Sequence, residues 1–271
     1  SYNFVIITNT DIVGSFTSPL LRGTSSNSTV MAMLKPFISK GIATGNGDFG
    51  TRYQMFPKTP DVNHMFYGIT PNQTVELNKK NIVTVNIKRI MAKINFTVDI
   101  LNPTFQPAEA SIPTFLTTTK LDVSRMPRAL DMTMTQRLTS ESGYVNCVVR
   151  SGAFTRVGTT GNKYQTTVFV LANNTNKAFL TLNLSTQNAS SGSGIAINQP
   201  RLFWVDTNLP IERNKIYNIT SSVLAGNFGG DPNQPTTINP EDPDSKLGNL
   251  IVNVVASDWE AAPVSGSGIM H

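Results

Sequence analysis

The sequence is poor in the residues that most reactive sites require. Cys147 is the sole cysteine, which excludes an internal disulfide and a cysteine-based zinc cluster. The two histidines are His64 and His271, and His271 is the last residue of the sequence. A serine or cysteine nucleophile activated by imidazole would therefore depend on His64. No apolar run reaches the ~20 residues that a membrane-spanning helix needs. We therefore expect no helical membrane anchor within these residues.

Charge is also scarce. Charged residues make up 14% of the 271 residues, and the formal net charge of +5 is spread along the chain. The adjacent basic pairs are Lys79–Lys80 and Lys88–Arg89, and no arginine-rich tract accompanies them. Nucleic-acid binding requires a concentrated basic surface, so this distribution argues against it.

The sequence instead contains many short apolar runs separated by Thr, Asn, Ser, Gly and Pro. This pattern favours an extracellular all-β protein over a cytosolic α/β enzyme. A strand is expected at the start, over residues 2–8, and one short helix over residues 28–38, where apolar residues recur at helical spacing. Later strands are expected at residues 110–116, 132–138, 145–150, 166–171, 178–184, 202–205, 216–224 and 250–256.

A change of register in residues 83–100 is the most informative pattern. Val83, Val85 and Ile87 are apolar at odd positions, but after Arg89 the apolar residues occupy even positions from Ile90 onward. Because side chains of a strand alternate between its faces, this slip predicts either a bulge or a passage from one sheet to another. We interpret it as a crossing between two β-domains.

Catalysis and metal binding find little support. The 17 carboxylates show no recognisable paired spacing, and His64 beside a predicted strand suits a structural role. The acidic loop before the last strand lacks the spacing of a known calcium loop and is rich in proline. We therefore predict no enzyme activity, no cofactor and no metal.

Four segments together resemble the fimbrillins of Bacteroidales, the type V pilins. Residues 4–10 are similar to the early apolar strand of the family, and residues 85–94 contain a match to its Lys-Arg-x-x-Ala-Arg/Lys signature. Residues 211–219 precede a Gly/Pro/Asn loop and a closing strand that ends at Asp258–Trp259, as in the family. Residues 168–173 match more loosely, with Ala172 where an acid is usual.

The resemblance implies two transthyretin-like β-sandwich domains, which we assign to residues 1–88 and 89–259. The first domain contains the expected short helix and, compared with the family, is expected to lack its first strands. It also implies export as a lipoprotein precursor, cleavage by an Arg/Lys-specific protease, and assembly with other fimbrial subunits on the bacterial surface. In such an assembly, a strand from one subunit fills a groove that processing opens in the next.

The resemblance and the residues together suggest where strand exchange would occur. The acceptor groove is expected to involve Phe4, Ile6 and Ile87. The donor is expected in the tail at residues 260–271, whose predicted inward face contains Ala262, Val264, Gly266, Gly268 and Met270. Pro263 and the glycines make this tail a poor strand, which leaves open an accessory or tip subunit, or a tail with no role.

An adhesin that binds a host glycan or protein is the main alternative. Such a module would present an exposed aromatic platform, and Trp204 and Trp259 are the two tryptophans. Both adjoin apolar strand residues, so we expect them to pack in the core.

Overall fold

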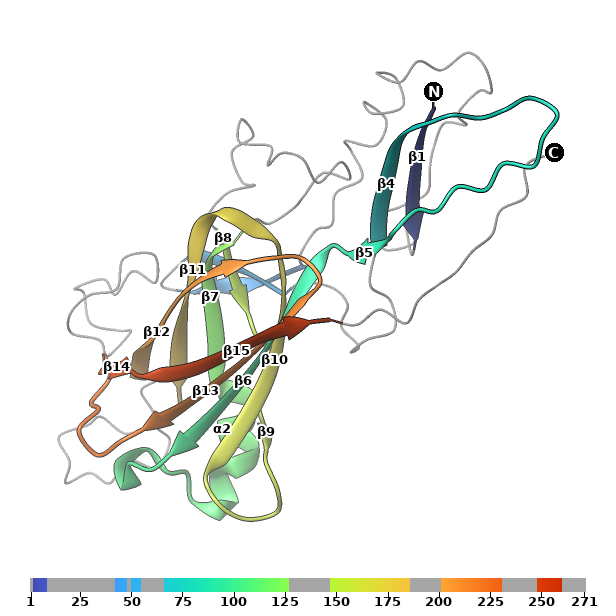
Figure 1. The fold of residues 1–271 in the computed structure, drawn as a ribbon. Coiled ribbons are helices and arrows are strands. Elements are labelled where there is room, and N and C mark those ends of the chain that lie inside the picture. Colours follow the sequence, from blue (N-terminus) through green and yellow to red (C-terminus); the bar gives the residue numbers. More distant parts are fainter. Residues whose placement is uncertain are drawn as a thin grey trace.

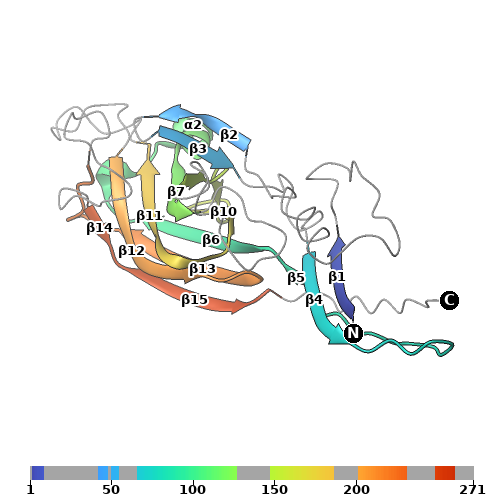
Figure 2. The same ribbon diagram turned by 90° about the horizontal axis from the view of Figure 1, so that it is seen from above.

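The computed structural model describes residues 2–8, 42–47, 50–54, 66–126, 147–185, 201–230 and 248–259. These residues form three β-sheets and one short α-helix, which confirms the predicted all-β class (Figure 1). Two of the sheets pack face to face as a sandwich, and the third lies to one side of it (Figure 2).

The sandwich contains a five-stranded and a seven-stranded sheet. The five-stranded sheet has the order β15–β13–β6–β10–β9, with strands β6 (Met91–Ile100), β9 (Thr155–Arg156), β10 (Lys163–Leu171), β13 (Lys215–Val223) and β15 (Val252–Asp258). The seven-stranded sheet has the order β14–β12–β11–β7–β8–β3–β2, with strands β2 (Ile42–Gly47), β3 (Gly50–Gln54), β7 (Lys120–Met126), β8 (Cys147–Arg150), β11 (Asn173–Leu184), β12 (Arg201–Ile211) and β14 (Gly248–Leu250).

β6 provides the centre of the core. Its even-numbered residues from Ala92 to Ile100 are fully buried, whereas its odd-numbered residues from Lys93 onward are only partly buried. Phe96 meets Phe154 edge to face, with ring centroids 6.4 Å apart. One face of β6 therefore packs into the sandwich, and the other forms part of its outer surface.

The third sheet is small and has the order β1–β4–β5, with β1 (Tyr2–Thr8), β4 (Phe66–Gln73) and β5 (Lys88–Arg89). β5 pairs with β4, whereas β6, which begins two residues later, pairs with β10 and β13. The predicted passage between sheets is thus confirmed. Residues 74–87 form the chain that returns from β4 to β5. Residues 83–87 of this returning chain alternate in exposure, but no strand is assigned to them, because β4 pairs on this side only with Lys88 and Arg89.

The division into residues 1–88 and 89–259 stays a prediction. The change of sheet occurs at its boundary, but β2 and β3 precede that boundary and belong to the seven-stranded sheet, where β3 runs parallel to β8. The N-terminal part of the chain therefore contributes strands to two different sheets.

The expected strand at residues 110–116 is wrong. A 3₁₀ turn, η3 (Glu109–Ser111), leads there into the helix α2 (Ile112–Thr118), and another 3₁₀ turn, η2 (Pro103–Phe105), precedes it. Pro113 lies in the first turn, where its missing N–H costs no hydrogen bond, and Ile112 and Phe115 are buried at helical spacing. The expected helix at residues 28–38 and the expected strand at 132–138 lie outside the described residues. The other expected strands coincide with β1, β8, β10, β11, β12, β13 and β15.

Candidate functional site

The three-stranded sheet exposes much of its apolar surface. β1 pairs with β4 on one side, and no other described strand pairs with its outer edge. Tyr2 is 60% exposed, and Ile6 and Ile69 are 41% and 43% exposed. Ile82, on the chain that returns from β4 to β5, is 73% exposed. The sheet therefore presents an open edge together with uncovered aliphatic and aromatic side chains.

Two of the predicted acceptor residues share one face of this sheet. In the β1–β4 ladder Phe4 is opposite Thr70 and Ile6 is opposite Gly68, and residues directly opposite each other project to the same face. The returning chain crosses this face, because Thr70 Oγ1 donates a hydrogen bond to the carbonyl of Thr84 at 2.9 Å.

Gly68 allows the same chain to pass close to β4. A Cβ at this position would lie 2.9 Å from the carbonyl carbon of Asn86 and 3.1 Å from Cα of Ile87. Ile87 thus adjoins the face that carries Phe4 and Ile6. The structure brings the three predicted acceptor residues to one region, whereas the predicted donor residues, Ala262 to Met270, lie outside the described residues.

Arg89 connects the small sheet to the sandwich. Its guanidinium carbon lies 4.9 Å from the ring centroid of Phe66 on β4 and 4.5 Å from that of Trp259, which follows β15. Its Nη1 also donates to the Trp259 carbonyl at 3.3 Å. Trp259 is 5% exposed and stacks on Phe169 of β10 at 5.9 Å. A planar cation between two aromatic rings holds both in place.

The turn between β12 and β13 packs at the same junction. Asn214 adopts φ +60°, its N–H donates to the carbonyl of Met91, and its carbonyl accepts from the N–H of Trp259, both at 2.8 Å. Arg213 Nη1 donates to the carbonyl of Tyr67 on β4 at 3.4 Å. The turn therefore contacts the small sheet, the start of β6 and the end of the described chain.

Tyr217 fixes this turn from within β13. Its hydroxyl donates to the carbonyl of Pro210 and accepts from the N–H of Glu212, each at 2.9 Å. Burial raises the pKa of this phenol above its usual value. The neutral hydroxyl is therefore the form that the fold favours.

The four segments that carry the family resemblance meet at this junction. β1 ends opposite Phe66, Arg89 belongs to the second segment, the β12–β13 turn to the third, and Phe169 to the fourth. Sequence reasoning found the segments but did not find that Arg89 and Trp259 contact each other. The register slip beside Arg89 was the local signal, and nothing in the sequence identified the aromatic partners.

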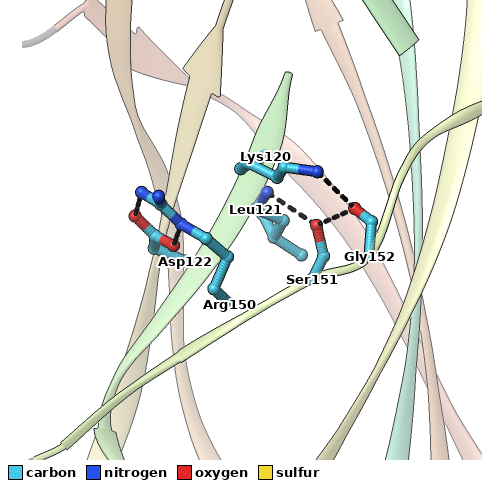
Figure 3. A network of polar contacts seen from close by, with 6 residues as sticks. All are labelled: Lys120, Leu121, Asp122, Arg150, Ser151 and Gly152. Carbon is cyan, nitrogen blue, oxygen red and sulfur yellow. Dashed lines mark hydrogen bonds and ion pairs between the residues drawn. The ribbon is translucent and has the colours of Figure 1, made fainter. Parts of the chain in front are cut away.

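A buried ion pair joins the neighbouring strands β7 and β8 of the seven-stranded sheet (Figure 3). Asp122 on β7 is 1% exposed and accepts from Nε and Nη2 of Arg150 on β8, both at 2.8 Å. Nearby, Ser151 Oγ accepts from the N–H of Leu121, and Lys120 Nζ donates to the carbonyl of Gly152. Burial, reinforced by the charge of Arg150, lowers the pKa of Lys120. The two-point contact fully engages the carboxylate, which suits a structural pair.

The remaining sequence candidates have different outcomes. Trp259 is buried, and Trp204 is half-buried against Phe179, with centroids 4.7 Å apart. His64 and the acidic loop before β14 lie outside the described residues, and the side chain of Cys147 is likewise not described. Within the described ranges, no cluster of three potential metal ligands occurs, and no helix has the length and apolarity needed to cross a membrane.

Comparison with known proteins gave likenesses of shape only. No family model matches the sequence, and no curated protein sequence matches it. A solved candidate cell adhesion protein from Bacteroides eggerthii is 15% identical, with a TM-score of 0.49 over 95% of this chain and 77% of that one. A fimbrial assembly protein from Parabacteroides distasonis is 13% identical, with a TM-score of 0.38 over 83% of this chain and 65% of that one.

A candidate cell adhesion protein from Bacteroides uniformis is also 13% identical, with a TM-score of 0.38 over 73% of this chain. This chain spans 61% of the length of that protein. With identities below 25% and TM-scores below 0.5, these likenesses assign no function to this chain.

Proposed function

We propose that this protein is a structural subunit of a surface fimbria and that it polymerises by accepting a β-strand from a neighbouring subunit. The observation that carries the proposal is the small sheet β1–β4–β5, in which no described strand pairs with the outer edge of β1 and Tyr2, Ile6 and Ile69 are exposed. A sheet of three strands with this much exposed apolar surface is stabilised by a partner that covers it.

A donated strand would both pair with the open edge of this sheet and cover its exposed apolar side chains. An added strand pairs with the free N–H and C=O groups of an edge. Its side chains alternate between the two faces of the sheet, one of which carries Ile6 and the other Ile69. Burying each large aliphatic or aromatic side chain contributes about 1.5–3 kcal/mol. The acceptor surface in this proposal comprises Phe4, Ile6 and Ile87, which adjoin one face of the sheet.

The donor in this proposal is the tail at residues 260–271, with Ala262, Val264, Gly266, Gly268 and Met270 facing the acceptor. Trp259 supports the assignment, because its contacts with Arg89 and Asn214 fix the point from which the tail departs. The proposal includes export as a lipoprotein precursor and cleavage by an Arg/Lys-specific protease, both of which the family resemblance implies.

Replacing residues 260–271 by a Gly/Ser linker of equal length tests the donor. This variant keeps the tail length and removes its apolar side chains, so we expect polymers to disappear from electron micrographs and from ladders on denaturing gels. A matched control places the same linker in the acidic loop at residues 233–244, and this control should still polymerise. Unchanged polymers from the tail variant would overturn the donor assignment.

Ile6→Lys tests the acceptor separately. Ile6 is 41% exposed on β1, beside the open edge of that strand. A lysine at this position should prevent strand docking, because its charge would have to be buried, while the monomer keeps its fold. Lys80→Glu, which changes an exposed charge on the chain that returns from β4, serves as the control. Normal polymerisation of Ile6→Lys would exclude this face as the acceptor.

A tip adhesin is the second candidate function. The buried Trp259 cannot serve as an exposed platform for a glycan. A different surface, a hollow on the outer face of the five-stranded sheet, favours this candidate.

A further inference from the structure

A hollow of about 490 Å³ lies on the outer face of the five-stranded sheet, at the end distant from the Arg89 junction. Residues from four neighbouring strands line it, and the turn after β13 closes one side. This volume is within the range of small-molecule sites in proteins. Because its floor is a sheet rather than a loop, the lining groups are held at fixed spacing.

Two cross-strand rows of polar side chains form the floor. In the first row, Asp99 of β6 is opposite Lys163 of β10 and Ser222 of β13. In the second, Thr220 of β13 lies between Thr97 of β6 and Asn253 of β15. All six residues line the hollow, and they supply hydroxyl, amide, carboxylate and ammonium groups.

The next row of residues along the same face lies outside the hollow and differs from the two rows of the hollow in its hydrogen bonds. There, Thr167 Oγ1 donates to Asn95 Oδ1 at 3.0 Å, and Asn95 Nδ2 donates to Asn218 Oδ1 at 2.9 Å. The polar side chains of that row therefore hydrogen-bond to one another. Within the described part of the chain, Thr97, Thr220, Ser222 and Asn253 have no such side-chain hydrogen bonds to each other or to neighbouring groups. Their donors and acceptors are available to a ligand.

The charge and the walls of the hollow restrict the class of ligand. Lys163 Nζ lies 3.9 Å from Asp99 Oδ2, so the two charges in the lining offset each other. Leu224 and Ile251 contribute apolar walls and are 54% and 87% exposed. A fitting ligand is therefore uncharged, rich in hydroxyl groups, and apolar on one side.

We propose that this hollow binds a neutral carbohydrate, with the sugar hydroxyls on the two polar rows and the C–H face of the ring against Leu224 and Ile251. A hexose presents both surfaces at once, since its hydroxyls project around a ring whose faces carry C–H groups. A peptide strand would instead pair through its backbone with the outer edge of β15, along which no described strand lies. The polar rows are on the face of the sheet and not at this edge. The proposal does not depend on polymerisation.

Methyl NMR of the full chain tests the proposal, with labelled threonine and isoleucine methyl groups. The probes are methyl α-D-mannopyranoside, N-acetyl-D-glucosamine and lactose, each titrated to tens of millimolar. We expect at least one sugar to shift the methyl signals of Thr97, Thr220 and Ile251 in a saturable manner and to leave Thr167 unaffected. No saturable shift with any of the three sugars would overturn the proposal.

Thr220→Val and Thr167→Val form a matched pair of variants on the same face of the five-stranded sheet. Each exchanges a hydroxyl for a methyl group, but only Thr220 lines the hollow. Losing one neutral hydrogen bond should raise the Kd of the active sugar by about three- to tenfold in Thr220→Val and leave it unchanged in Thr167→Val. Equal effects of the two variants would place binding elsewhere and overturn the proposal.

Two further outcomes separate the alternatives. A synthetic peptide of residues 260–271 that shifts the same methyl signals, when the sugars do not, would replace the carbohydrate by a peptide strand and overturn the proposal. The linker variant of residues 260–271 should bind the active sugar as wild type does. If this variant loses its polymers and still binds the sugar, strand donation by the tail and carbohydrate binding by the hollow are tested independently.

Discussion

Arg89 and Trp259 are 170 residues apart in the sequence, yet the guanidinium carbon lies 4.5 Å from the indole centroid and Nη1 donates to the Trp259 carbonyl. Phe66 covers the guanidinium within 4.9 Å. This contact joins the small sheet to the end of β15. It therefore relates the surface proposed to accept a strand to the start of the tail proposed to donate one.

Arg89→Lys should lower the free energy of unfolding by about 1–3 kcal/mol, because lysine keeps the charge and loses the planar stacking and the directed hydrogen bond. Chemical denaturation followed by tryptophan fluorescence measures the change, and Trp259 at the junction contributes to the signal together with Trp204. Lys80→Ala removes an exposed cation of the same region and should change stability by less than about 0.5 kcal/mol. Equal stabilities of Arg89→Lys and wild type would contradict the structural role of this contact.

Gly68→Ala should destabilise the small sheet by about 1–3 kcal/mol, since the added methyl group collides with the backbone at Asn86 and Ile87. Hydrogen exchange of β1 and β4 amides should accelerate selectively. Gly226→Ala is the matched control, because a methyl group there meets no atom within 4 Å. Protection of β1 and β4 that is the same in both variants would show that the returning chain does not cross Gly68.

Asp122→Ala should cost about 3–5 kcal/mol, because it leaves the largely buried Arg150 without its carboxylate. Glu76→Ala is the control, since Glu76 and its ion-pair partner Lys79 are 58% and 69% exposed. Its loss should cost at most about 1 kcal/mol. Urea midpoints at neutral pH measure both, and similar losses would contradict the importance of burial.

Tyr217→Phe should change how stability depends on alkaline pH. Burial raises the pKa of Tyr217 in the folded protein, so its contribution is complete below the unfolded pKa of about 10 and is lost as pH rises toward the folded pKa. Between these values the folded state retains a proton that the unfolded state has released. Unfolding free energies of wild type should therefore fall more steeply than those of Tyr217→Phe above pH 10. Parallel curves would show that the phenol is not protonated preferentially by folding.

Local pattern predicted much of the secondary structure. The period-2 runs identified most described strands, and the register slip beside Arg89 located the passage between sheets, because alternation depends only on the strand backbone. The same reasoning failed at residues 110–116, where Pro113 begins a helix turn and the short apolar run fits either period. Short runs of this kind carry too few residues to separate the two patterns.

The sequence determined that this is an all-β chain poor in the residues of catalysis, and that its register changes once beside Arg89. Tertiary structure decided which strands are neighbours: it placed Trp259 on Arg89, aligned the free hydroxyls of Thr97 and Thr220, and left Tyr2, Ile6 and Ile69 of the small sheet exposed. The physical reason is that alternation and turn propensity are local properties of the chain. Contacts between residues more than 100 positions apart depend instead on how complete sheets pack.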